Sequence, residues 1–261
     1  PEYVAKWHED GDAVADDWVT PLRGLPFVKV LDKSKTALTN SVLEAHRLNS
    51  PYIENSSWFS NLKSEIGYDD KARRPIDMRK QVYPVILKYD PNSLLHGFFL
   101  ESIAGVIRSP RALSGFIEAQ SVTVASSGGV KNDRVDASQS EQGGAKEGYG
   151  NVPFARDEFC GKLNAYFSVD LAQIKGFALG EAVERLLVLL GLYKIQAVLE
   201  RGLRLRTACD LEVANLTVKR PKEFVLPNIS QLEERVKGAA EAVQGRFAPG
   251  RITEVTWQPK K

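Results

Sequence analysis

The sequence predicts an α+β fold, and three features of its C-terminal half carry that prediction. Residues 163–171 and 204–213 each alternate apolar and polar side chains, which is typical of strands with one buried face. Between them, residues 181–201 are apolar on most sides at helical spacing and end at Gly202. Together these segments indicate a half-buried sheet with helices on one face, whose polar face is free to meet a ligand.

Composition predicts a folded globular protein. The chain has 261 residues, of which 43% are hydrophobic and 26% are charged, with a net charge of +2. That length is enough to build a substantial core. Two cysteines suit a reducing compartment and cannot form a zinc site of ordinary spacing, so we expect a cytoplasmic protein without a metal or other cofactor. No apolar run reaches the roughly 18 residues that cross a bilayer, and no signal peptide is recognisable.

The N-terminal half begins with a predicted strand followed by a predicted short helix. Residues 27–32 are mostly apolar and follow two prolines, which favours a short strand. Residues 41–48 place Ser41 and Glu44 at capping-box spacing before Asn49, Ser50 and Pro51 end the segment. We therefore expect a helix over residues 41–48.

Two more helices are predicted before the middle of the chain. Residues 58–66 carry apolar side chains at helical spacing, and Gly67 follows as a C-terminal stop. Asp90 and a following proline mark the start of another helix, with apolar residues continuing to position 103. We expect that helix to run over residues 91–103.

The last predicted element is an amphipathic helix over residues 229–247. Ser230 and Glu233 have capping-box spacing, which marks its start. The apolar residues recur on one side: Leu232, Val236, Ala240, Val243 and Phe247. These five side chains are expected to face the core.

A glycine-rich stretch at residues 126–150 is not explained by regular structure. It holds two glycine pairs and almost no large apolar side chains. Loops of this length are functional or lack fixed structure. Apolar strand-like segments at residues 116–125 and 161–171 flank it, so we expect a hairpin-like protrusion from a sheet.

Signatures of catalysis are weak in this chain. It has no phosphate-binding P-loop, no nucleophile elbow and no dinucleotide-binding glycine motif. We expect His46 and His96 to be packed or surface histidines of short helices. Residues 71–88 hold six basic side chains against one aspartate, which indicates either attraction to a polyanion or a solvated loop.

Five strings of residues carry a resemblance to a known family: 44–53 (EAHRLNSPYI), 90–98 (DPNSLLHGF), 110–119 (PRALSGFIEA), 128–136 (GGVKNDRVD) and 165–176 (AYFSVDLAQIKG). In this order they resemble the backbone subunit of the type I-G (formerly I-U) CRISPR Cascade complex, a member of the RAMP superfamily. The resemblance implies one RAMP-type domain over residues 1–261, with a modified RRM/ferredoxin-like palm. It also implies a finger-like insertion at about 50–90 and a thumb hairpin at about 126–160. The chain begins at a proline, so we expect the family's first strand and helix to lie upstream.

The function implied by the resemblance is non-catalytic RNA binding. Subunits of this kind line up along the CRISPR guide RNA, contact further copies of themselves and other Cascade subunits, and leave the guide free to pair with target DNA. The matched motifs imply RNA contacts, with no catalytic or metal-binding residue, at Lys131, Asn132, Arg134, Arg108 and Arg111.

Two enzymatic alternatives stay open. A target-cutting RAMP subunit uses a loop aspartate to support metal-dependent RNA cleavage, and Asp133 or Asp136 could serve here, although ion pairs with the neighbouring cations are the simpler explanation for these carboxylates. A RAMP nuclease that processes precursor RNA usually relies on histidine, for which the candidates are His46 and His96.

Overall fold

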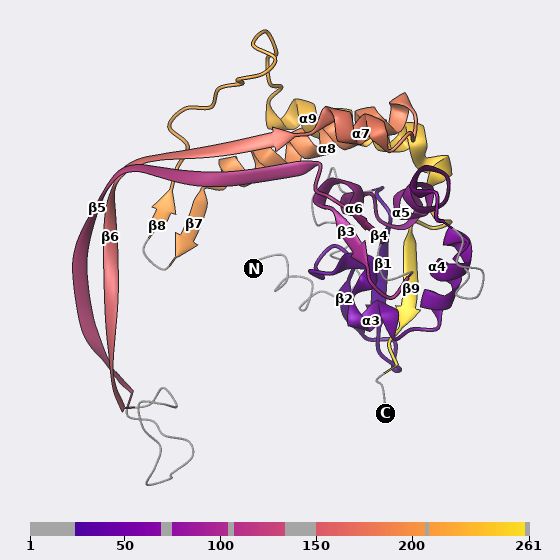
Figure 1. Ribbon diagram of the computed structural model, residues 1–261, viewed down its shortest axis with the longest axis horizontal. Coiled ribbons are helices and arrows are strands. Elements are labelled where there is room, and N and C mark those ends of the chain that lie inside the picture. The colour runs from indigo at the N-terminus through magenta and orange to yellow at the C-terminus, as the bar shows by residue number, and fades with distance from the viewer. Residues whose placement is uncertain (1–23, 69–74, 104–106, 134–149, 207–208, 259–261) are drawn as a thin grey trace. The chain divides into compact units, whose positions relative to one another are not determined.

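A computed structural model describes residues 24–68, 75–103, 107–133, 150–206 and 209–258 of the chain (Figure 1). The chain divides into two compact units, one made of Pro1–Ser114 with Ser168–Lys261 and the other of Gly115–Phe167. Helices and small sheets are mixed along the sequence, which confirms the predicted α+β class. The RRM-like palm and its finger insertion stay predictions.

A three-stranded sheet in the first unit has the order β2-β1-β9. The central strand β1 (Phe27–Leu31) runs antiparallel to β2 (Ala37–Asn40) and parallel to β9 (Ile252–Thr256), so the C-terminal strand lies beside the first (Figure 1). The predicted strand at residues 27–32 is confirmed. Val28 and Val30 are fully buried, so β1 belongs to the core of this unit.

The helix expected over residues 41–48 is wrong. This segment consists of turns that lead into the 3-10 helix η2 (Arg47–Asn49). The two side chains expected to form the capping box are engaged elsewhere. The Ser41 hydroxyl accepts a hydrogen bond from a backbone N–H of β1, at 3.2 Å, and the Glu44 carboxylate accepts one from the Ser50 hydroxyl, at 3.0 Å. Contacts distant in sequence therefore override the local helical signal.

Helices follow η2 in quick succession: α3 (Pro51–Glu54), α4 (Trp58–Ile66), the π-helical turn η3 (Met78–Val82), α5 (Tyr83–Tyr89) and α6 (Pro91–His96). The predicted helix at residues 58–66 is confirmed, and Gly67 ends it in a left-handed conformation with φ of 73°. No helix in the described ranges is long and apolar enough to cross a membrane.

The helix predicted over residues 91–103 is shorter than expected. It begins as predicted, with the Asp90 carboxylate accepting from the backbone N–H of Asn92, but it ends at His96. Gly97 has φ of 76° and turns the chain into β3 (Phe98–Leu100), which pairs antiparallel with β4 (Ile107–Ser109). The apolar residues expected on one helix face are therefore divided between a helix and a strand.

The C-terminal helices are α7 (Leu171–Gly176), α8 (Glu181–Glu200) and α9 (Ile229–Val243), followed by the 3-10 turn η5 (Gln244–Arg246). Helix α8 matches the predicted long apolar helix, and α9 lies along it (Figure 1). The five residues expected to face inward are all buried, but the helix is shorter than expected and ends at Val243, so Phe247 lies beyond it, after η5. The capping box, however, is made by Asn228 and Gln231, two residues before the expected pair.

The strand expected over residues 204–213 is instead a hairpin. β7 (Leu203–Arg206) pairs antiparallel with β8 (Cys209–Leu211), with Leu203 opposite Leu211. Two antiparallel strands that are close in sequence still alternate apolar and polar residues, so sequence periodicity does not distinguish them from one longer strand.

The second unit is built on two long paired strands, β5 (Leu113–Asp133) and β6 (Gly150–Val169). β5 contains the strand expected at residues 116–125, and β6 contains the strand expected at residues 161–171 except for its last two residues, because α7 begins at Leu171. β5 also continues through residues 126–133, where irregular structure was expected. The expected one-sided burial is wrong, because Leu163 and Phe167 are 41% and 36% exposed. The predicted thumb hairpin over residues 126–160 stays a prediction, and these paired strands are longer than it.

Replacing Asn228 with alanine tests the observed start of α9. The Asn228 side chain accepts a hydrogen bond from the backbone N–H of Gln231 at 2.9 Å, so its loss should destabilise the protein by about 1 kcal/mol. Ser230→Ala, at the cap position expected from the sequence, is the control and should have little effect. Urea unfolding of both variants measures the difference, and equal losses would contradict this assignment.

Candidate nucleic-acid interface

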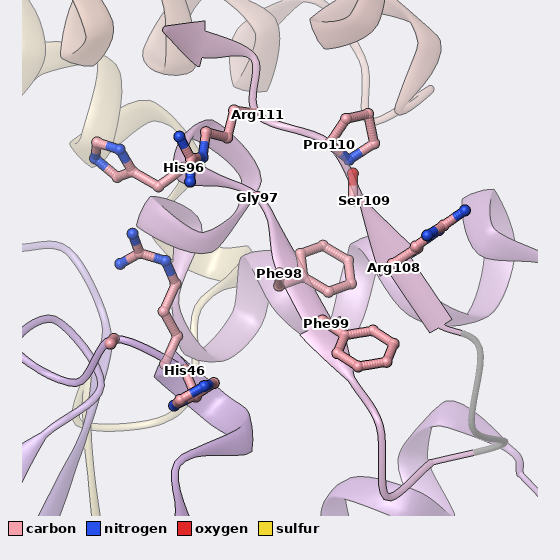
Figure 2. Close-up of a pocket in the computed structure, with 11 residues that line it drawn as sticks. His46, His96, Gly97, Phe98, Phe99, Arg108, Ser109, Pro110 and Arg111 are labelled. Carbon is pink, nitrogen blue, oxygen red and sulfur yellow. The ribbon is translucent and has the colours of Figure 1, made fainter.

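A pocket of about 450 Å³ opens in the first unit, where three segments distant in sequence meet (Figure 2). Each segment includes part of one of the strings 44–53, 90–98 and 110–119 that carry the resemblance. The residues that line the pocket come from η2 and the turn before it, from the end of α6 with β3, and from β4 with the turn after it. They are Ala45, His46, Arg47, His96, Gly97, Phe98, Phe99, Arg108, Ser109, Pro110 and Arg111.

One wall of the pocket depends on a close backbone approach at Gly97. A Cβ atom there would lie 2.8 Å from the carbonyl oxygen of Ser109 and 3.1 Å from the carbonyl carbon of Pro110. Two hydrogen bonds hold the same turn. The backbone N–H of Ala112 donates to the carbonyl of Leu95 at 2.9 Å, and a side-chain amide from α7 donates to the Pro110 carbonyl at 2.6 Å. The turn is therefore fixed on both sides.

Positive charge dominates the pocket. Arg47, Arg108 and Arg111 line it, and no carboxylate is among the lining residues that the structure describes. None of these arginines forms an ion pair within the described ranges. Burial lowers the pKa of the Arg47 guanidinium from its usual value, the neighbouring Arg111 charge lowers it further, and the Asp90 charge opposes both. A bound anion would offset this concentration of positive charge.

A buried polar network lies behind the pocket and joins α6 to α8. The Asp90 carboxylate is fully buried and accepts hydrogen bonds from the Asn92 backbone N–H and the Ser93 hydroxyl, at 3.1 and 2.8 Å. The Lys194 ammonium of α8 donates to the Asn92 side-chain oxygen at 2.6 Å and contacts His96 Nε2 at 2.7 Å. Two helices are thereby locked at the residue where the pocket wall begins.

Electrostatics keeps His96 neutral. Burial, together with the positive charges of Lys194, Arg47 and Arg111, lowers the pKa of His96 to about 3. A neutral imidazole accepts the Lys194 N–H at Nε2. Burial also lowers the pKa of Lys194 to about 7 and raises that of Asp90. His96 is therefore a neutral imidazole at neutral pH, and its contact with Lys194 helps to hold the pocket wall.

The two histidines differ in environment. His96 is packed, as the sequence analysis expected, whereas His46 is exposed and lies in the turn that leads into η2 rather than in a helix. Both line the pocket, and Figure 2 shows His96 beside Arg111. Within the described ranges no group of three or more His, Cys, Asp and Glu side chains gathers in the way that a metal site needs.

The structure brings together two of the five residues that the resemblance implied. Arg108 lies on β4 and Arg111 follows Pro110, and both are exposed at the pocket. The backbones of Lys131 and Asn132 belong to the C-terminal end of β5, and their side chains lie outside the described part. Arg134 and Asp136 lie outside the described residues altogether.

Sequence reasoning missed two residues of this site. Arg47 lies within the string 44–53, so the resemblance held a signal for it. Lys194 ends the longest apolar run in the sequence, and a lone lysine inside a buried helix signals a partner in the core. The basic stretch at residues 71–88 is partly engaged within the chain, because Lys88 pairs with Glu65 at 2.8 Å.

Comparison with known protein families links the first part of the chain to CRISPR systems. The model of a family described as CRISPR-associated protein GSU0053 matches residues 9–124. The match indicates a CRISPR-associated protein. It spans every residue that lines the pocket, and it supports a role in CRISPR defence. No curated protein matches the chain.

Gly97→Ala should destabilise the protein by about 1–3 kcal/mol, because the new Cβ meets backbone atoms and the left-handed conformation disfavours a side chain. Gly238→Ala is the matched control. Gly238 lies on α9 with nothing within 4 Å of the position that a Cβ would take, so that change should stabilise the helix slightly. Urea unfolding measures both, and an unaffected Gly97 variant would show that the close approach is not needed.

His96→Gln should flatten the dependence of stability on acid pH. The pKa of His96 is about 3 in the folded state against an ordinary value of 6.5, so the unfolded chain binds an extra proton between these values. Stability is thus lost as the pH falls from about 6.5 to about 3. Glutamine retains an acceptor for Lys194 but cannot titrate. Denaturant unfolding at several pH values should show a smaller loss in the variant, and parallel profiles would contradict the assignment.

Proposed function

We propose that this CRISPR-associated protein is a non-catalytic RNA-binding backbone subunit of the RAMP type, in a type I-G Cascade surveillance complex. Copies of the chain polymerise along the guide RNA and present it for pairing with target DNA. The observation that carries the proposal is the pocket, whose three arginines have no ion pair within the described ranges. The pocket lies in the region that the CRISPR-associated family model matches.

Contacts to phosphates fit this role better than contacts to bases. A guide RNA must leave its base edges free to pair with target DNA, so the protein has to bind the sugar-phosphate backbone. Arginine suits that task because its planar guanidinium matches the geometry of phosphate oxygens. A few such contacts in each subunit suffice, since they add along the RNA.

The charge balance of the chain is compatible with a filament. A net charge of +2 lets copies pack head to tail without strong mutual repulsion, while three arginines line the pocket. The paired strands β5 and β6, of 21 and 20 residues, support the proposed thumb. They expose apolar side chains such as that of Phe116, and a neighbouring molecule can cover these side chains.

Replacing both Arg108 and Arg111 with alanine should weaken binding of single-stranded RNA without altering the fold, since both side chains are exposed. Each lost phosphate contact should reduce the slope of log affinity against log salt by about 0.7. The matched control is Arg235→Ala with Lys237→Ala, which removes two exposed charges from α9. Fluorescence anisotropy with several unrelated RNA sequences measures affinity.

Three outcomes count against the proposal. Equal losses in the two double variants would remove the special role of the pocket, and strong preference for one short sequence would contradict backbone binding. RNA cleavage by the parent in magnesium would move the chain to the metal-dependent RAMP ribonuclease alternative, since a non-catalytic subunit leaves the strand intact.

A further inference from the structure

We propose that the pocket seats one phosphate of the bound RNA between the Arg47 guanidinium and the Ser109 hydroxyl. This inference rests on the proposed function and deepens it, because it assigns the ligand group and two residues that neither the resemblance nor the family match singles out. Arg47 comes from η2 and Ser109 from the end of β4, so the seat forms only when these segments meet.

Unsatisfied polar atoms point to the seat. Within the described ranges four buried side-chain atoms have no hydrogen-bond partner, and two of them, Arg47 Nε and Ser109 Oγ, belong to residues that line this pocket. Ser109 is only 6% exposed, so its hydroxyl is not solvated as a surface serine would be. Folded proteins rarely leave buried donors unpaired, and a ligand bound at the pocket would satisfy both groups.

The backbone at Arg47 is held in an unusual conformation. Its φ is 51°, in the left-handed region that residues other than glycine seldom adopt. Two hydrogen bonds hold the turn, because the Arg47 N–H donates to the Glu44 carbonyl at 3.1 Å and the Arg47 carbonyl accepts from the Ser50 N–H at 3.0 Å. Strained residues that their surroundings hold in place are concentrated at binding sites.

The charges around Arg47 favour an anion. Arg111 lies close enough to lower the pKa of Arg47, and repulsion between the two guanidinium groups would be relieved by a phosphate that contacts both. Asp90 attracts Arg47, but the carboxylate already accepts hydrogen bonds from Asn92 and Ser93. A phosphate can therefore supply what Asp90 does not, a direct acceptor for Arg47 Nε.

The chemistry of the seat fits a phosphodiester. Guanidinium N–H groups and a serine hydroxyl all donate hydrogen bonds, and the non-bridging oxygens of a phosphodiester only accept them. The pocket volume of about 450 Å³ accommodates a phosphate with its adjoining sugar. Arg108 is exposed and lines the same pocket.

Ser109→Ala separates a binding role from a structural one. Removing a buried, unpaired hydroxyl should leave the unfolding temperature unchanged or higher, while affinity for RNA should fall several-fold because the phosphate loses a donor. Ser64→Ala, on the exposed side of α4, is the control and should change neither quantity.

Arg47→Lys keeps the charge but removes the Nε donor and the planar fork. We expect affinity to fall about tenfold, the scale of one charge-assisted hydrogen bond, with an unchanged salt slope. Arg235→Lys on α9 is the control. The probes are a mixed-sequence single-stranded RNA, the same strand with uncharged methylphosphonate linkages, and inorganic phosphate alone. Anisotropy measures binding of the strands, and the unfolding temperature measures the effect of inorganic phosphate.

The seat is supported if the methylphosphonate strand binds the parent weakly and if Ser109→Ala lowers affinity without loss of stability. It is overturned if the parent binds both strands equally, or if Ser109→Ala binds RNA as tightly as the parent. A parent that fails to bind RNA but is stabilised by inorganic phosphate, with that effect lost in Ser109→Ala, would refute the proposed function and retain the seat. If the parent binds RNA and neither Ser109→Ala nor Arg47→Lys lowers the affinity, the seat is refuted and the proposed function is retained.

Discussion

The placement of Lys194 in the protein interior is the constraint on which the rest of the site depends. Its ammonium joins α8 to α6 through Asn92 and His96, at the point where α6 ends. From there Gly97 directs the chain into β3, whose pairing with β4 forms one wall of the pocket. A cation that is costly to bury is tolerated because the Asp90 charge lies nearby, and this balance fixes the relative position of two helices.

Local sequence signals predicted the elements whose stability is itself local. Residues 58–66 and 181–201 are helical because their apolar side chains recur at helical spacing and a glycine stops each of them. The prediction failed where a side chain binds a partner distant in sequence. Ser41 looks like a helix cap, but its hydroxyl is taken by β1, and no property of residues 41–48 alone reveals this.

The candidate site was predictable only in part, because some of its distinguishing properties exist only in the folded chain. Arg108 and Arg111 were implied by the resemblance, and the structure places both at the pocket. Arg47 was not predicted, because its distinguishing properties are an unpaired Nε, partial burial and a left-handed backbone, and all three exist only in the folded chain. Lys131, Asn132 and Arg134 belong to a segment whose side chains lie outside the described residues.

Net charge is a poor guide to binding in this protein. Whether each Lys or Arg side chain is buried or paired with a carboxylate matters more than how many such side chains there are. Lys29 is almost fully buried beside Glu254, and Lys88 pairs with Glu65, so neither contributes much field at the surface. The pocket arginines have no such carboxylate within the described ranges, and Arg47 is also partly removed from water. Desolvation weakens screening by solvent and salt, so a few unpaired arginines in a pocket attract an anion more strongly than the same charges spread over a surface. A chain with a net charge of only +2 can therefore hold a polyanion at one place while remaining able to pack against copies of itself.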